Sequence, residues 1–182
     1  MAVLRGIQVL DFTTTIAGPY CARLLADLGA TVIKIEAPEG DMMRDRQPLR
    51  DGASTAFGQL NAGKQSVRLD LKQPDAQAAV RRLLATADVV VENFRPGVMR
   101  RFGLDWDAMR AVKPDLVYCA ISGFGQTGPD AARAAYAPAI HAASGFDLAH
   151  LAYQDTRERP DNCGIYVADV VTAIYAFGAI VA

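Results

Sequence analysis

Apolar runs rich in β-branched residues alternate along the chain with segments whose apolar residues recur at helical spacing. Runs of strand length occupy residues 7–12, 31–36, 66–71, 88–92 and 116–121. Helical segments between them begin near Pro19 and Pro74, cover 98–102 and 106–112, and continue as an alanine-rich stretch to Ser144. Strands that alternate with helices pair in parallel through right-handed crossovers. The pattern therefore predicts a Rossmann-like, doubly wound α/β fold with a mainly parallel sheet.

Three segments refine this prediction. The run at 88–92, DVVVE, is apolar at each inner position, as in a strand covered on both faces. Residues 37–58 are rich in polar and turn-forming types and are expected to form a loop. Residues 170–182 are apolar but shorter than the roughly 20 residues of a membrane span, so a core helix is expected. Because apolar residues continue to Ala182 without a cap, we expect the sequence to be the N-terminal part of a longer chain.

Composition narrows the class of protein. The 182 residues are 51% hydrophobic and carry a net charge of −1, which fits one globular domain and argues against a nucleic-acid partner. The three cysteines are far apart without CxxC spacing, which argues against a disulfide framework and a zinc site. Asp11 interrupts the first apolar run, so a secretory signal is not expected. These features predict a soluble, cytoplasmic protein that is not associated with a membrane.

Ligands of doubly wound sheets bind at the carboxyl ends of the strands, which directs attention to 13–19, 37–41, 93–97 and 122–129. Residues 123–128, GFGQTG, match the G-x-G-x-x-G dinucleotide fingerprint. However, Pro129 and Asp130 interrupt the helix entry that this fingerprint needs, and no strand ends in an acidic residue about 20 positions later. We therefore expect a flexible active-site loop here and no nicotinamide binding.

Asp169 is the only charged residue between Asp161 and the end of the chain. Burying a carboxylate costs several kcal/mol, about 3–5 when it lacks a partner. Residue type alone fits a helix N-cap as well as a nucleophile, and the roles are compatible because a carboxylate at a helix N-terminus is ionised. His141 and His150 lack a second ligand at metal spacing and are expected to be ordinary partly buried or surface histidines.

Several motifs occur in a recognisable order over nearly the whole chain. They are GIQVLDF (6–12), AGP (17–19), LGATVIKIE (28–36), GD (40–41), NAGKQSVRLDLK (61–72), DVVVENFRPG (88–97), SGFGQTGP (122–129) and the region of Asp169. In this order they resemble the family III CoA-transferases, the group that includes formyl-CoA transferase and the carnitine CoA-transferases. The resemblance implies that residues 1–182 are the N-terminal part of a large CoA-binding α/β domain, without the small domain and the C-terminal return segment.

The resemblance also implies a reaction and a set of site residues. In this family an aspartate, here Asp169, attacks an acyl-CoA thioester and exchanges CoA onto an acceptor carboxylic acid through anhydride and aspartyl-CoA intermediates. CoA is then a substrate, no cofactor is permanently bound, and the protein is an interlocked homodimer. The residues matched to CoA or substrate binding are Ala17, Leu69, Asp70, Leu71, Lys72, Asn93, Phe94, Arg95, Arg101, Arg133, Tyr136 and Ala137.

Some positions depart from the family. Ile16 and Pro38 stand where formyl-CoA transferase has a glutamine and an arginine, and the segment around Tyr136 lacks the commoner Gly-Tyr-Asp. A related α-methylacyl-CoA racemase is the first alternative, but it needs a histidine where this chain has Tyr136, and a phenol with a pKa of about 10 is a poor base. The second alternative is a CoA-binding or assembly fragment without activity.

Overall fold

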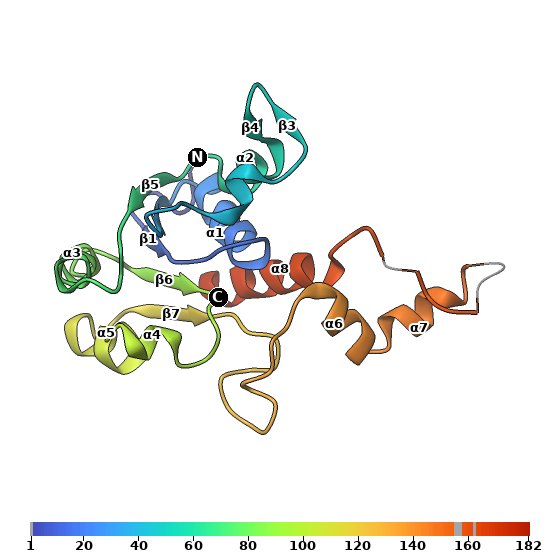
Figure 1. Cartoon of the computed structure of the whole chain (residues 1–182). Helices are drawn as coiled ribbons and strands as arrows, with labels where there is room; N and C mark the ends of the chain where they lie inside the picture. The colour runs from blue at the N-terminus through green and yellow to red at the C-terminus, as the bar shows by residue number, and fades with distance from the viewer. Residues whose placement is uncertain (1, 155–157, 162) are drawn as a thin grey trace.

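The computed structural model describes residues 2–154, 158–161 and 163–182, and Figure 1 shows their arrangement. Within these residues five strands form one sheet in the order β5-β2-β1-β6-β7, and every neighbouring pair is parallel. The strands are β1 (Gln8–Asp11), β2 (Thr31–Glu36), β5 (Gln65–Arg68), β6 (Val89–Glu92) and β7 (Val117–Ala120). The predicted parallel α/β sheet is confirmed.

Helices cover both faces of this sheet because successive strand residues point to opposite sides. Val9 packs in one apolar cluster with α1 (Ala17–Asp27) and α8 (Val167–Val181). Its neighbour Leu10 packs in a second cluster with the helices of the opposite face. Those helices are α3 (Pro74–Leu84), α4 (Val98–Arg101) and α5 (Trp106–Val112). The fold is therefore doubly wound, as predicted.

The strand order reverses direction between β1 and β6. The chain passes from β1 through α1 to β2 on one side, and from β6 through α4 and α5 to β7 on the other. The connections that leave β1 and β6 therefore lead to opposite sides of the sheet. Such a topological switch point opens the crevice in which doubly wound proteins bind their ligands.

The predicted loop at 37–58 is wrong in detail. It contains a 3₁₀ turn, η1 (Met42–Asp45), a small hairpin of β3 (Leu49–Arg50) and β4 (Ala53–Ser54), and the beginning of α2 (Thr55–Asn61). Asp41 caps η1 by accepting from the Met43 N–H at 2.9 Å, and Ser54 caps α2 by accepting from the Phe57 N–H at 3.1 Å. These polar side chains initiate short elements here, a role that composition does not separate from loop formation.

The C-terminal segment is helical, but it is not a core helix. Ala173 of α8 is fully buried against the sheet, and α8 packs along α1, whereas Val171, Ile174 and Tyr175 are 44%, 49% and 77% exposed. Two further helices, α6 (Ala137–Ala143) and α7 (Phe146–Leu151), extend away from the sheet (Figure 1). No helix among the described residues is both long and apolar enough to cross a membrane. The polar composition of 154–163 predicts a turn, of which residues 155–157 and 162 lie outside the described residues.

Candidate active site

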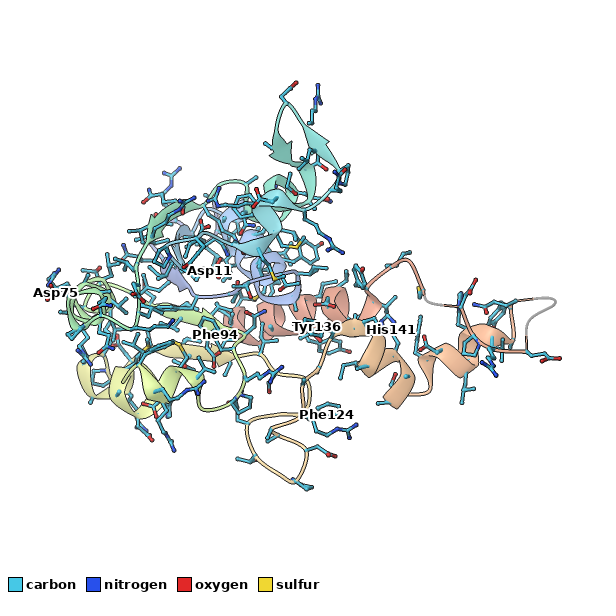
Figure 2. The ribbon with its side chains drawn as sticks, viewed as in Figure 1. Asp11, Asp75, Phe94, Phe124, Tyr136 and His141 are labelled. Carbon is cyan, nitrogen blue, oxygen red and sulfur yellow. The ribbon has the colours of Figure 1, made fainter. Side chains whose placement is uncertain are left out.

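A pocket of about 270 Å³ lies at the switch point, at the carboxyl edge of the sheet. Its wall comes from the loops after β1, β6 and β7 and from the first turn of α8. Figure 2 labels Phe94, at the end of β6, and Tyr136, beside α8. Of the residues matched to the family's site, the structure places eight in this wall: Ala17, Asn93, Phe94, Arg95, Arg133, Tyr136, Ala137 and Asp169. The carboxylate is thus in a pocket that four separate segments assemble.

A second pocket of about 250 Å³ lies between the loops that follow β2 and β5. Four more of the matched residues line it, Leu69, Asp70, Leu71 and Lys72. Phe94 lines both pockets, so the two are neighbours. Arg101, matched to a phosphate contact, is exposed at the end of α4 and belongs to the lining of neither pocket.

Asp169 is the third residue of α8 and is half-buried. The N-cap position belongs to Tyr166, so the N-cap interpretation of Asp169 is wrong. Burial raises the pKa of Asp169, and the main-chain N–H of Ala17 opposes that rise. The carboxylate also lies in the first turn of a helix, where the positive end of the macrodipole favours its charge. Asp169 is therefore partly desolvated, while the Ala17 N–H and the N-terminus of α8 favour its charged form.

His141 is buried, with an exposed fraction of 2%, whereas the sequence led us to expect an ordinary partly buried or surface histidine. The Ala168 N–H donates to its Nε2 at 3.1 Å, and the Phe146 ring lies 4.8 Å from the imidazole between centroids. Its Nδ1 has no hydrogen-bond partner within the described part of the chain. No group of three or more His, Cys, Asp or Glu side chains among the described residues is placed to hold a metal ion.

Asn93 connects the two loops of the switch point. Its Oδ1 accepts from the Thr14 N–H and its Nδ2 donates to the Thr14 carbonyl, both at 2.8 Å. The next residue, Thr15, has φ of 71°, which a β-branched side chain seldom adopts. Such a conformation costs of order 1–3 kcal/mol and persists where surrounding contacts impose it. The carboxamide of Asn93 supplies two of those contacts.

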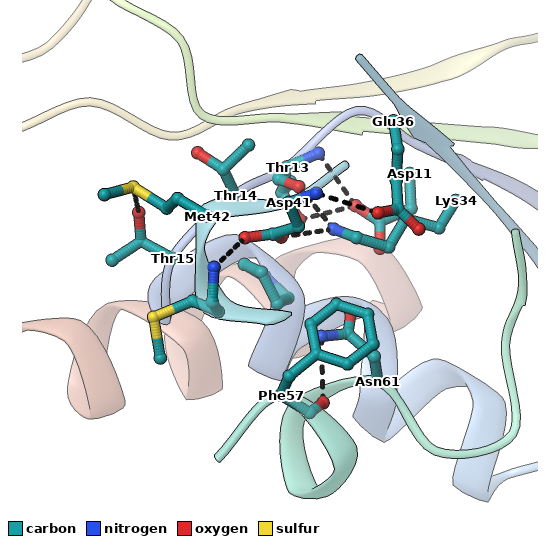
Figure 3. A network of polar contacts seen from close by, with 12 residues as sticks. Asp11, Thr13, Thr14, Thr15, Lys34, Glu36, Asp41, Met42, Phe57 and Asn61 are labelled. Atoms are coloured by element: carbon teal, nitrogen blue, oxygen red, sulfur yellow. Dashed lines mark hydrogen bonds and ion pairs between the residues drawn. The ribbon is translucent and has the colours of Figure 1, made fainter. Parts of the chain in front are cut away.

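A buried ionic network holds the loop after β1 (Figure 3), and its residues Thr13, Lys34 and Asp41 line the second pocket. Asp11 accepts from the Thr13 N–H at 2.9 Å and forms an ion pair with Lys64 at 2.8 Å. Lys34 donates to the Thr13 carbonyl at 2.6 Å and pairs with Asp41 at 2.9 Å. The side chains of these four charged residues are at most 1% exposed. This network was not predicted from the sequence, although Lys34 and Glu36 are charged residues within an apolar strand and could have indicated it.

Two glutamates at strand ends have strongly shifted pKa values. Burial would raise the pKa of Glu36, but hydrogen bonds from Arg44, Ser66 and the Asp41 N–H outweigh it and lower that pKa to about 2. In Glu92 burial dominates over the donors Phe94 N–H and Tyr118 hydroxyl, and the pKa rises to about 7. Glu92 comes immediately before the loop that contributes Phe94 to both pockets, and its pKa lies near neutrality.

The glycine-rich segment after β7 does not lead into a helix. The chain is irregular from Ile121 to Tyr136 and only then enters α6, so the geometry of a dinucleotide fingerprint is absent from this described segment. Gly123 is required for packing, because a Cβ there would lie 2.0 Å from the Cβ of Ala135. Both residues line the pocket of Asp169. The loop therefore forms pocket wall.

Comparison with known proteins agrees with this geometry. The family model for CoA-transferase family III matches residues 4–182. The succinate–glutarate CoA-transferase of Agrobacterium fabrum is 42% identical over 185 residues, which cover 97% of this chain and 46% of that protein. The succinyl-CoA–D-citramalate CoA-transferase of Chloroflexus aurantiacus is 40% identical over 182 residues, covering 98% of this chain and 44% of that protein. The chain spans about half the length of the curated relatives it matches.

Solved structures give the same answer. A CAIB/BAIF family protein from Brucella suis superposes with a TM-score of 0.88 at 39% identity, covering 97% of this chain and 47% of that one. A hypothetical protein from Mycobacterium tuberculosis superposes with a TM-score of 0.88 at 35% identity, covering 98% and 49%. The family model spans almost the whole chain, and the fold superposes over the same extent. The chain therefore belongs to CoA-transferase family III.

Proposed function

We propose that the protein transfers CoA from an acyl-CoA thioester to a carboxylic acid, with Asp169 as the nucleophile. The observation that carries this proposal is the position of Asp169, a half-buried carboxylate in the first turn of α8 that lines the switch-point pocket. The neighbouring pocket with Leu69–Lys72 offers space for the remainder of a long CoA substrate, and Phe94 borders both spaces. Family membership supports the same reaction.

Each step exchanges one acyl bond for another. An oxygen of Asp169 attacks the thioester carbonyl, the C–S bond breaks and CoA leaves as a thiolate, which gives a mixed anhydride. The thiolate attacks the aspartyl carbonyl, releases the first acid as a carboxylate and forms aspartyl-CoA. The acceptor carboxylate then displaces the thiolate, and the thiolate attacks the acceptor's carbonyl to give the new thioester and free Asp169. No net proton is transferred, and the covalent route divides a difficult exchange into easier steps.

The substrates proposed are short dicarboxylic acids and their CoA thioesters. The named relatives act on succinate, glutarate and citramalate, which all carry a second carboxylate. The guanidinium groups of Arg95 and Arg133 belong to residues that line the Asp169 pocket and can bind a carboxylate by paired hydrogen bonds. We also propose a homodimer in the cytoplasm, with no permanently bound cofactor. Sedimentation of the intact protein at micromolar concentration tests the dimer, and a monomer there would contradict it.

A racemase is less well supported by the site. Its proton transfer needs a second base opposite the carboxylate, and the matched position is Tyr136, which is 68% exposed. The nearby His141 cannot supply the base in this arrangement because its Nε2 already accepts from Ala168. The site thus favours transfer between carboxylates over proton abstraction.

The test is a CoA-exchange assay on the intact protein. Succinyl-CoA is the donor, and glutarate, citramalate and a monocarboxylate such as butyrate are the acceptors. We expect exchange to the dicarboxylates in wild type and none in Asp169→Asn, which keeps the side-chain volume. Racemisation of a 2-methylacyl-CoA without exchange would favour the racemase. CoA binding without either reaction would favour the second alternative, a CoA-binding or assembly fragment without activity.

A further inference from the structure

We propose that Asn93 is a positioning residue, whose carboxamide fixes the loop after β1 and thereby the Ala17 N–H in the pocket of Asp169. The inference rests on the proposed function for its kinetic consequence. It departs from the assignment that the sequence resemblance implies, in which Asn93 contacts CoA. Its basis is a path of three steps that runs from the end of β6, through the turn before α1, to the first turn of α8.

The first contact is the clamp on Thr14. Asn93 and Thr14 are 79 residues apart in the chain, and both main-chain groups of Thr14 bond to one carboxamide at 2.8 Å. A carboxamide is planar and presents its acceptor and its donors in fixed directions. Two bonds to one peptide segment therefore fix both the position and the orientation of that segment. They also commit the Oδ1 of Asn93 to the protein.

The second step is the turn between Thr14 and α1. Thr15 has a positive φ of 71°, and Ile16, the N-cap of α1, makes no side-chain capping hydrogen bond. The beginning of α1 thus lacks the usual local restraint, a capping side chain. The strained turn that leads into it is held from outside, by Asn93 above and by the Asp11 and Lys34 contacts to Thr13 below.

The third step is the contact with Asp169. Ala17 is the first residue of α1 and lines the same pocket as Asp169. Its main-chain N–H lowers the pKa of the Asp169 carboxyl. This N–H is not used in α1 itself, because the first four N–H groups of a helix have no intrahelical partner. If the clamp is lost, Thr15 can leave its strained conformation and the direction of the Ala17 N–H changes. Asp169 then loses a donor that favours its charged form.

The experiment compares Asn93→Ala and Asn93→Asp with wild type in the intact protein. Asn93→Asp keeps an acceptor for the Thr14 N–H but sets a carboxylate oxygen against the Thr14 carbonyl. For both we expect kcat to fall about 10- to 100-fold, as for a misplacement near 1 Å. KM for acyl-CoA should stay within about threefold, because uniform binding is not removed. The acidic limb of the kcat–pH profile should move to higher pH, since Asp169 must be ionised to attack.

The groups that face Asp169 are His141 of α6 and, in the same pocket, Arg95, Arg133 and Tyr136. All remain in both variants, so a moved limb in Asn93→Ala reports the lost donor. Asn93→Asp also adds a carboxylate to the same pocket, which itself raises the pKa of Asp169, so its pH limb is not used for this test. The matched control is Asp88→Ala. The Asp88 carboxylate accepts from the Gln8 N–H at 2.9 Å and so, like Asn93, bonds the main chain of the β1 segment from the β6 segment. Asp88 lies at the opposite edge of the sheet from Asn93. This control should lower stability without moving the pH limb.

Two measurements that do not depend on turnover separate this inference from the proposed function. They are amide hydrogen exchange at residues 14–17 and the pKa of Asp169 from carboxyl-carbon NMR, and both should rise in Asn93→Ala. If wild type exchanges no CoA but both quantities rise, the proposed function fails and the positioning role stands. If Asn93→Ala raises KM for acyl-CoA tenfold or more with an unchanged kcat and pH limb, Asn93 is a CoA ligand and the inference is wrong. Unchanged amide hydrogen exchange at residues 14–17 and an unchanged pKa of Asp169 in Asn93→Ala would also overturn it.

Discussion

The imidazole Nε2 of His141 accepts the main-chain N–H of Ala168 at 3.1 Å, one residue before Asp169. The bond joins α6 to the first turn of α8, whose N-cap residue, Tyr166, offers no side-chain capping bond. A histidine from another helix thus performs the task of a capping side chain.

Replacing His141 therefore tests the anchoring of α8. His141→Phe keeps an aromatic ring beside Phe146 but removes the acceptor, so we expect a loss of about 1–3 kcal/mol in the free energy of unfolding. His141→Gln retains an acceptor of similar reach and should lose less. Chemical denaturation measures the loss, and amide exchange should localise it to the first turn of α8. Equal losses in the two variants would show that the acceptor is unimportant.

Asp169 is expected to form the covalent intermediate. Asp169→Asn should bind acyl-CoA and exchange no CoA, and Asp169→Glu should lose on the order of 10²-fold because its carboxylate is displaced. Treating wild type with acyl-CoA and then hydroxylamine should convert Asp169 to a hydroxamate, detected by mass spectrometry of its peptide. Asp169→Asn, treated alike, is the control. Trapping on another peptide, or substantial exchange by Asp169→Ala, would exclude this role.

CoA phosphates are expected to bind at Lys72 and Arg101. Lys72 lines the second pocket and Arg101 lies exposed at the end of α4. Losing one phosphate contact should weaken CoA binding by about 1.5–3 kcal/mol, as for a hydrogen bond to a charged group. Calorimetric titration of CoA at low salt measures this for Lys72→Ala and Arg101→Ala. Lys113→Ala, at a residue that lines neither pocket, is the control. Unchanged affinity in Arg101→Ala would remove that residue from the CoA site.

Glu92 should make stability depend on pH between about 4.5 and 7. Its pKa of about 7 lies above the ordinary value, because burial disfavours the charged form. The folded state then holds a proton that the unfolded state has released, so stability falls as pH rises through this interval. The fall is of order 3 kcal/mol at about 1.4 kcal/mol per pKa unit. Denaturation at pH 5 and pH 8 measures it.

Glu92→Gln is the matched variant for this measurement. Its amide oxygen can still accept from the Phe94 N–H, which lies 2.9 Å from a Glu92 carboxyl oxygen. We expect this variant to be more stable than wild type at pH 8 and to lose most of the fall between pH 5 and 8. An undiminished fall would assign the effect to another group.

The buried pair of Lys64 and Asp11 should support the same loop from below. Lys64→Met leaves Asp11 as an unpaired charge that is fully buried, which costs about 3–5 kcal/mol. Replacing Lys113, whose partner Asp115 is exposed, in the same way should cost less than about 1 kcal/mol. Thermal unfolding of the two variants measures the difference. Similar losses would mean that Lys64 is not needed to neutralise Asp11.

The sequence by itself determined the sheet and the wrapping of its helices. The strand at 31–36 has the predicted bounds, and the other four strands lie within one or two residues of the predicted ends or are shorter. This succeeded because strands buried on both faces need continuous apolar runs, and a parallel sheet needs helical crossovers between them. Of the thirteen residues that the family motifs matched to the site, all except Arg101 line one of the two pockets.

Polar residues were harder to interpret from sequence. Asp41 and Ser54 appeared to be loop residues and instead cap short helices. Asn93 appeared only as a matched CoA residue, and His141 as an ordinary histidine. In each case the side chain bonds a main-chain group, and for Asn93 and His141 the partner is 79 or 27 residues away. A residue's type states what it can donate or accept, but not which distant group folding brings to it.

The apolar pattern thus determined which segments become strands and helices, because burial follows local periodicity. Only the tertiary structure decided that the loops after β1 and β6 meet beside α8. There Asn93 can hold Thr14, Ala17 can donate to Asp169, and His141 can hold Ala168. These contacts depend on strand order and on distances of about 3 Å between polar atoms, which local sequence does not encode.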